Sequence, residues 1–146
     1  MMAKPEAWRL DLASYPEVIT TQTRFQDLDP NGHLNNVAFA ALFENARVRS
    51  MLRPMQAEQR QSGDRTLVVS ITINYLAEGS FPDDVTLATG IGHIGRSSWV
   101  IVQAMFQNGR CIATADSVIA MRNGEGAVPL PDALRTWLMG RAAKPV

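Results

Sequence analysis

Residue types that carry covalent or metal chemistry are scarce in this chain of 146 residues. Its one cysteine, Cys111, allows no internal disulfide and indicates no oxidising compartment. Cys111 has no neighbouring base in the sequence, and a free cysteine usually packs as a small hydrophobe. The only two histidines, His33 and His93, do not stand with carboxylates at the spacing of a metal site. We therefore expect no disulfide, no catalytic cysteine and no bound metal.

Long apolar runs are also missing. No run approaches the roughly 20 residues that cross a bilayer, and residues 1–16 (MMAKPEAWRLDLASYP) lack the apolar stretch of a signal peptide. A Gly-x-Ser-x-Gly turn is absent too, so nothing supports a serine mechanism of the α/β-hydrolase type. The sequence predicts a soluble cytoplasmic protein that does not associate with membranes.

Neither sign of charge is in excess, since Lys+Arg and Asp+Glu both count 14. A balanced charge gives no support to nucleic acid or an acidic membrane surface as a partner. The length fits one domain, and 46% hydrophobic residues provide for a core. We expect a single domain over residues 1–146, with residues 1–17 as an irregular N-terminal arm.

The pattern along the chain predicts one long helix followed by strands. The helix should run from about Asn36 to Arg53 and stop at Pro54, because proline disfavours helix at the residue before it. Residues 56–66 are polar and predict a loop. Alternating apolar residues and turn signals then predict antiparallel strands, and Pro131 and Asp132 open a short helix that ends at Gly140. The expected strands are Val18–Phe25, Val69–Tyr75, Val85–Ile94, Ser98–Phe106 and Arg110–Arg122.

The stretch from Arg24 to Arg53 has the richest chemistry. Asp27 and Asp29 stand two residues apart and point the same way on an extended chain. The following Pro-Asn-Gly favours a turn, and either Asn35 or Asn36 can cap the helix after it. A carboxylate would then face unpaired helix N–H groups, which attract negative charge and developing oxyanions.

These residues also carry a resemblance to a known family. The pattern R-F-x-D-x-D-x-x-G-H-x-N-N followed by F-x-x-x-F-E-x-A-R resembles the signature of the 4-hydroxybenzoyl-CoA thioesterase-like family of hotdog acyl-CoA thioesterases. Weaker similarity continues through T-L-V-V-S, F-P-D-D-V and G-R-S-S-W-V. The resemblance implies an α+β hotdog fold, in which a five-stranded antiparallel sheet wraps around one long helix. It also implies a substrate tunnel between subunits, and hence a homodimer or a dimer of dimers.

The resemblance assigns roles to residues of the turn. Asp29 maps onto the aspartate that acts as nucleophile or general base, and the backbone N–H near Asn36 would stabilise the carbonyl oxygen. His33 would orient the acyl carbonyl or bond the backbone of the turn. From spacing alone, capping of the turn is the favoured interpretation of Asp29, and the match of the whole motif reverses that preference. Asp27 is expected to order the turn or pair with Arg24.

Further residues are candidates for substrate binding. Gly32 and Asn35 belong to the turn. Glu44 is the alternative catalytic carboxylate, although an i,i+3 pair with Arg47 is the favoured interpretation. Coenzyme A carries phosphates, and the turn at Arg96, Ser97 and Ser98 resembles the one where relatives contact it, although an ordinary hairpin tip is as good an interpretation.

The leading hypothesis is thus hydrolysis of an acyl-CoA to free acid and CoA, with CoA as part of the substrate and no other cofactor. Two alternatives stay open. One is a non-catalytic acyl-CoA-binding protein on the same scaffold. The other is a dehydratase acting on a hydroxyacyl thioester, for which only Asp29 with His33 could serve. The sequence does not identify the acyl chain or distinguish CoA from an acyl-carrier protein.

Overall fold

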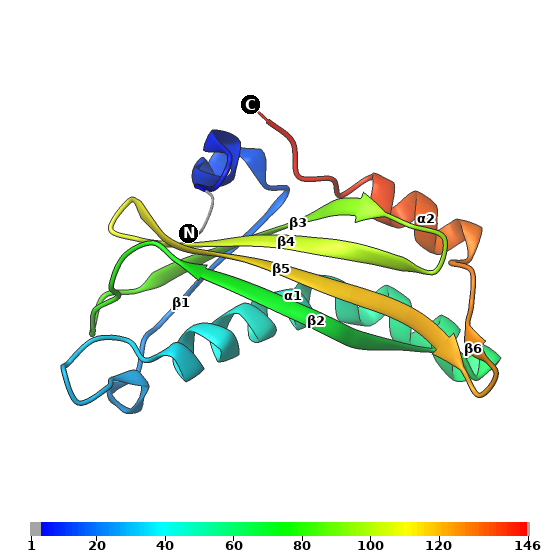
Figure 1. Ribbon diagram of the computed structural model, residues 1–146, viewed down its shortest axis with the longest axis horizontal. Coiled ribbons are helices and arrows are strands. Elements are labelled where there is room, and N and C mark those ends of the chain that lie inside the picture. Colours follow the sequence, from blue (N-terminus) through cyan, green and yellow to red (C-terminus); the bar gives the residue numbers. More distant parts are fainter. Residues whose placement is uncertain (1–3, 146) are drawn as a thin grey trace.

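A computed structural model describes residues 4–145 and, within that range, all side chains except those of residues 52–62. One antiparallel sheet curls around a long helix, α1 (Asn36–Ser62), which lies along one face (Figure 1). The strand order is β1-β3-β4-β5-β2, and a short sixth strand pairs with β5. The bounds are β1 Glu17–Thr21, β2 Arg65–Tyr75, β3 Val85–Ile94, β4 Ser98–Gln107, β5 Arg110–Asn123 and β6 Gly126–Ala127. The α+β class and the antiparallel sheet around one helix are as predicted.

The helix and the inner face of the sheet share a core. Phe39, Phe43 and Ala46 of α1 pack against Leu87 and Met105 of the sheet, all of them buried. Side chains of this size contribute about 1.5–3 kcal/mol each when fully buried. This stripe of α1 is the apolar face that its 3.6-residue period predicts.

A buried glutamine ties the helix to the sheet. Gln103 of β4 is fully buried, and its Nε2 donates to the Phe43 carbonyl oxygen and to Thr89 Oγ1, both at 3.1 Å. Because unpaired buried N–H donors would be costly, these two bonds fix where α1 lies along the sheet.

The predicted end of α1 is wrong. Pro54 does not stop the helix, which continues to Ser62, so most of the expected loop at residues 56–66 is helical instead. Gln, Ala, Glu and Arg follow the proline and all have good helix propensity. The helix ends before Gly63, whose φ of +74° is the left-handed conformation that suits glycine after a helix. β2 begins at Arg65, four residues earlier than expected.

The N-terminal part of the chain differs from the prediction in detail. β1 ends at Thr21, and Phe25–Asp27 forms a 3₁₀ turn instead of strand. The arm contains two further 3₁₀ turns, η1 (Ala7–Leu10) and η2 (Leu12–Ser14), and Tyr15 packs on the outer face of the sheet. Figure 1 shows the arm, in dark blue, on the side of the sheet away from α1.

At the other end, α2 (Asp132–Met139) has the predicted bounds. Its Leu134 and Leu138 pack with Trp99 and Ile101 of β4. In the part of the chain that the structure describes, no helix is both long and apolar enough to cross a membrane.

Candidate functional site

The turn that precedes α1 is closed by its own backbone. Leu28 and Leu34 form an antiparallel bridge, and the Asp29 N–H donates to the His33 carbonyl oxygen at 2.8 Å. Gly32 within the turn has a φ of +82°, which only glycine adopts at little cost. Pro30, Asn31 and Gly32 therefore form the predicted turn, and Asp29 stands at its start.

One carboxylate oxygen of Asp29 is hydrogen-bonded within this turn. Its Oδ1 accepts the backbone N–H groups of Asn31 at 2.9 Å and His33 at 3.1 Å. Within the described residues, Oδ2 has no hydrogen-bond partner, and the side chain is half-buried. The turn thus holds the carboxylate in one orientation and leaves one oxygen for another molecule. The capping interpretation of Asp29 is correct, and it is compatible with a catalytic role.

Asn35 caps α1. Its Oδ1 accepts the Ala38 N–H at 2.7 Å, which settles the choice between Asn35 and Asn36. Asn36 is the first helical residue, and its N–H and that of Val37 have no intrahelical acceptor. Two donors therefore point out of the helix N-terminus, two and three residues after Leu34, whose bridge to Leu28 closes the Asp29 turn.

Asp27 has a structural role, as expected. It is buried and accepts from the Arg24 backbone N–H at 2.9 Å and from Arg24 Nη2 at 2.9 Å. This pairing raises the pKa of the Arg24 guanidinium. The Asp27 carbonyl oxygen accepts the Asn35 N–H at 2.8 Å, so the same residue links the 3₁₀ turn to the helix cap.

His33 turns its side chain toward a residue that sequence reasoning missed. His33 Nε2 lies 3.0 Å from Glu78 Oε2, in the loop between β2 and β3. In the same loop Gly79 accepts the Leu34 N–H at 3.0 Å through its carbonyl oxygen. A Cβ on Gly79 would lie 2.5 Å from Leu34 Cδ1, so a residue without a side chain is needed there. No local sequence signal connects Glu78 to His33.

The other predicted residues lie elsewhere within one chain. Arg96, Ser97 and Ser98 form the β3–β4 turn, at the end of the sheet opposite to the Asp29 turn (Figure 1). Glu44 lies on the exposed side of α1, with Oε2 3.9 Å from Arg47 Nη2. The predicted i,i+3 pair is present but long. A single chain therefore holds Asp29 and His33 in one turn, just before α1 begins at Asn36, and leaves the Arg96 turn apart from them.

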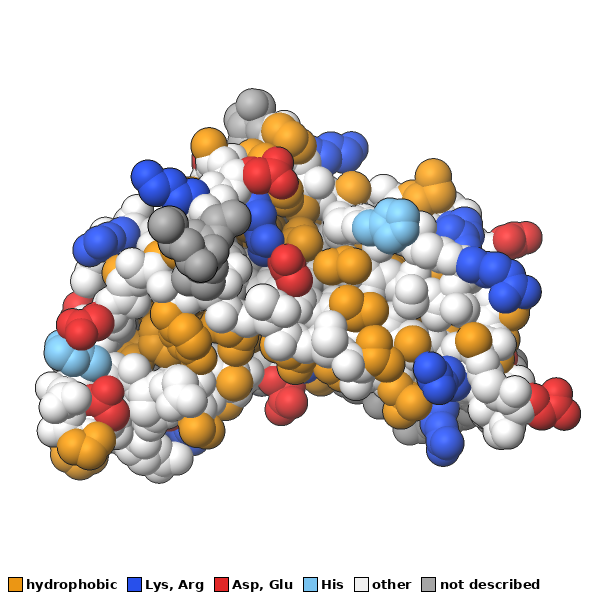
Figure 2. Space-filling model, in the orientation of Figure 1, with side chains coloured by type: hydrophobic (Ala, Val, Ile, Leu, Met, Phe, Trp, Pro, Cys, Tyr) orange, Lys and Arg blue, Asp and Glu red, His pale blue; other side chains and the backbone are white. Residues whose placement is uncertain are grey.

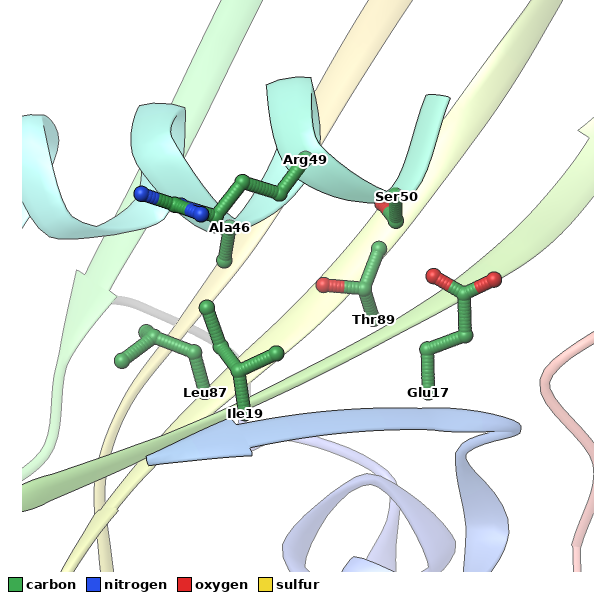
Figure 3. A pocket seen from close by; sticks show the side chains of 7 residues that line it. All are labelled: Glu17, Ile19, Ala46, Arg49, Ser50, Leu87 and Thr89. Carbon is green, nitrogen blue, oxygen red and sulfur yellow. The ribbon is translucent and has the colours of Figure 1, made fainter. Parts of the chain in front are cut away.

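A small pocket lies between α1 and strands β1 and β3. Figure 3 shows Arg49 and Ser50 of α1 opposite Ile19, Leu87 and Thr89 of the sheet. Its volume of about 80 Å³ is too small for an acyl-CoA, and none of the predicted site residues lines it. Among the described residues, no three His, Cys, Asp or Glu side chains gather as a metal site.

Comparison with known proteins decides the family. A model of the thioesterase-like superfamily matches residues 23–138, which include the Asp29 turn, α1 and all of the sheet except β1. The chain belongs to this superfamily. Membership makes it a thioester hydrolase and confirms the predicted family.

Solved structures support the same assignment. A thioesterase from Thermus thermophilus, solved with coenzyme A and Zn, is 28% identical over 87% of this chain and 95% of its own, with a TM-score of 0.76. A predicted thioesterase from Bacillus stearothermophilus is 26% identical over 88% and 98%, with a TM-score of 0.78. The PA5185 protein of Pseudomonas aeruginosa PAO1 is 25% identical over 94% and 98%, with a TM-score of 0.79. No curated protein sequence matches the chain. The hotdog fold is confirmed.

Proposed function

We propose that this protein is an acyl-CoA thioesterase in which Asp29 is the catalytic carboxylate. The proposal rests on the hydrogen bonding of the Asp29 side chain, in which one carboxylate oxygen is bonded within the turn and the other has no partner among the described residues. Oδ1 is fixed by two backbone N–H groups, and Oδ2 is left for the reaction beside the N-terminus of α1. Thioester hydrolysis needs an attacking oxygen and a group that stabilises the carbonyl oxygen, and this turn supplies both kinds.

The proposed steps follow from these positions. The Asn36 N–H binds the acyl carbonyl oxygen and stabilises its negative charge as a tetrahedral intermediate forms. Asp29 Oδ2 either attacks the carbonyl carbon or takes the proton from an attacking water. The C–S bond then breaks, and CoA leaves as a thiolate that takes up a proton. If Asp29 attacks directly, water hydrolyses the resulting anhydride and restores the carboxylate.

Coenzyme A is the proposed carrier of the acyl group. The Thermus thermophilus relative was solved with coenzyme A. In this chain, the Arg96 guanidinium is an exposed donor suited to a phosphate, and Ser97 and Ser98 flank it. Because this turn is distant from Asp29 within one chain, the proposal requires that a second subunit bring it near.

We propose a homodimer built on the edge strand β2, alone or as half of a dimer of dimers. β2 ends the sheet and exposes Leu67, Val68, Val69 and Ile71, and such an apolar edge is a template for pairing with another strand. Pairing two β2 strands about a two-fold axis reverses the second sheet. The partner's Arg96 turn then lies at the same end as Asp29, so that one site uses both subunits.

The alternatives receive less support. A dehydratase would use Asp29 together with His33, but His33 Nε2 lies 3.0 Å from Glu78 Oε2 instead. A binding protein without turnover would not need the free Oδ2 of Asp29.

The proposal is tested by incubating the purified protein with acyl-CoAs of short, long and aromatic acyl groups and measuring free thiol. Release of CoA from at least one class is expected, and it should persist after exhaustive dialysis against EDTA because no step uses a metal. Tight binding of acyl-CoA without release would favour the non-catalytic acyl-CoA-binding protein. Formation of an enoyl product from a 3-hydroxyacyl-CoA would favour the dehydratase.

A further inference from the structure

A buried positive charge in α1 lacks an adequate partner among the side chains that the structure describes. The Arg47 side chain is only 6% exposed. Its Nη1 donates to Ser117 Oγ at 3.3 Å, and the nearest acid, Glu44, is 3.9 Å away with a side chain that is 69% exposed. Burial lowers the pKa of the Arg47 guanidinium. A guanidinium has five N–H donors, and a buried charge is costly unless it is paired and hydrogen-bonded.

Arg47 lies beside the middle of the open edge of the sheet. Ser117 of β5, its hydrogen-bond partner, is in register with Ile71 of β2. Ile71 is next to Ser70, the central residue of Arg65–Tyr75, and is 46% exposed. No other strand covers β2 on its outer side, because the described sheet ends there. The unsatisfied charge and the unpaired edge thus occupy the same part of the molecule.

The side of α1 nearest this edge is also uncovered. Phe39 contacts Tyr75 of β2 on this side, whereas Arg49 and Ser50 point to the β1 side (Figure 3). The surface of α1 between these two sides includes Val37, which is 70% exposed, and Val48, which is 39% exposed. Glu44 stands between the two valines in the sequence. Within one chain, neither valine is covered by another element. Figure 2 shows a face of the molecule on which hydrophobic side chains lie among others, with charged side chains both near its centre and at its periphery.

A second copy of this chain fits the surface. In a dimer paired through β2, the two-fold axis passes close to Ser70 and the two α1 helices lie antiparallel on the same face of the joined sheet. About such an axis, a residue displaced to one side along a helix meets the residue displaced equally to the other side on the partner helix. Arg47 and Glu44 are one helical turn apart beside that axis, so each meets the other's equivalent. The surface is self-complementary in charge, positive against negative on both sides.

We propose that Arg47 of each subunit pairs with Glu44 of the partner subunit, in two symmetric ion pairs across an otherwise apolar interface. This inference rests on the dimer of the proposed function. The carboxylate completes the hydrogen bonding of the buried guanidinium, and Glu44 is an interface residue, not a catalytic one. Charged groups in an apolar interface also penalise misaligned pairings. The two pairs therefore hold the β2 register that brings the partner's Arg96 turn to Asp29.

Two charge-reversal variants, mixed with one another, distinguish ion pairs across the interface from an ion pair within one chain. The first variant is Glu44→Arg and the second is Arg47→Glu, each with a different affinity tag. Across the interface each variant repels its own copy, but a mixed dimer restores both attractions. Within one chain, either change places like charges one turn apart, and mixing restores nothing.

The expected result is that each variant alone dimerises at least ~100-fold more weakly than the wild type in sedimentation equilibrium, since a desolvated charge pair is lost twice. The mixed dimer should approach wild-type affinity. Arg49→Glu, the same change on the opposite side of α1, should leave dimerisation unaltered. If Arg47→Glu does not fold, Glu44→Gln decides the question, because an exposed side chain tolerates this change and dimerisation should still weaken at least ~10-fold.

A monomeric wild type, a mixed dimer no stronger than the single variants, or an unaltered Glu44→Gln dimer would each overturn the inference. CoA release by the wild-type protein is measured separately. Hydrolysis without the ion pair would leave the proposed function intact, and the ion pair without hydrolysis would refute only the function.

Discussion

Glu78 Oε2 lies 3.0 Å from His33 Nε2, although the two residues belong to different loops. The neighbouring hydrogen bond from the Leu34 N–H to the Gly79 carbonyl oxygen joins the same two loops. The loop between β2 and β3 therefore holds the turn that carries Asp29. Because β2 is also the proposed dimer edge, the turn and the interface share one strand and its following loop.

The Glu78→Gln variant should keep the fold and lose little activity. Both side chains of the pair are well exposed, 42% for His33 and 74% for Glu78, and exposed ion pairs contribute at most about 1 kcal/mol. We expect kcat/KM to fall by no more than about fivefold, which is the equivalent of that energy. Glu125→Gln, in the exposed β5–β6 turn, is the matched control. A loss of two orders of magnitude would assign Glu78 a chemical role that this account does not include.

Gly79→Ala should destabilise the protein by about 1–3 kcal/mol, because its Cβ would lie 2.5 Å from Leu34 Cδ1 in a packed region. Thermal unfolding measures the change. Gly124→Ala is the control, since a Cβ at Gly124 meets nothing within 4 Å. Adding Leu34→Ala to Gly79→Ala should cost less than the sum of the two single changes, since the second change removes the clash. An additive result would show that the contact is not the cause.

The sequence predicts β3, β4 and β5 to within about one residue at each end because their signals are local. Val85–Ile94 lies between a proline turn and a glycine turn, and both of its predicted bounds are correct. Asp132–Met139 is equally well marked by Pro131 and Gly140. At Pro54 a local rule was overridden, since helix-forming residues on both sides extend α1 through it. Propensity summed over many residues outweighs one unfavourable position.

Part of the candidate site could also be predicted, because the signals for that part are local in the sequence. Asp29, Gly32, His33 and Asn35 lie within one turn, so spacing alone brings them together. The position of Glu78 beside His33 and the burial of Arg47 depend on contacts between distant segments, and no pattern in the sequence indicates either of them. The sequence predicts Arg47 as an i,i+3 partner of Glu44. The two residues are neighbours on the helix, but the 3.9 Å between Arg47 Nη2 and Glu44 Oε2 makes the pair a long one.

Stability should depend on Cys111 at alkaline pH. Burial raises the pKa of this thiol, with small opposing effects from hydrogen bonding and from Arg9. Since the folded-state pKa lies above the unfolded value of about 8.5, the stabilisation is fully present below that pH and is lost as pH rises through the folded pKa.

Urea unfolding of the wild type and of Cys111→Ala at about pH 7 and about pH 10 measures this contribution. The stability advantage of the wild type over the variant should shrink at the higher pH. Tyr15, whose pKa burial also raises, titrates in both proteins, and its shift differs between them only by the contribution of Cys111, which ranks after burial and Arg9. An advantage that grows with pH would contradict the assignment. The kcat of Cys111→Ala should equal that of the wild type, because no step uses the thiol.

The most direct test of the account is the turnover number of Asp29→Asn with the best acyl-CoA substrate. Asparagine keeps an Oδ1 that can accept the Asn31 and His33 N–H groups, so the turn should survive and thermal unfolding should change little. Asparagine offers neither a nucleophilic carboxylate nor a base. We predict at least a ~100-fold loss of kcat, the low end for removal of acid–base catalysis. A folded Asp29→Asn protein that releases CoA at the wild-type rate would contradict the account.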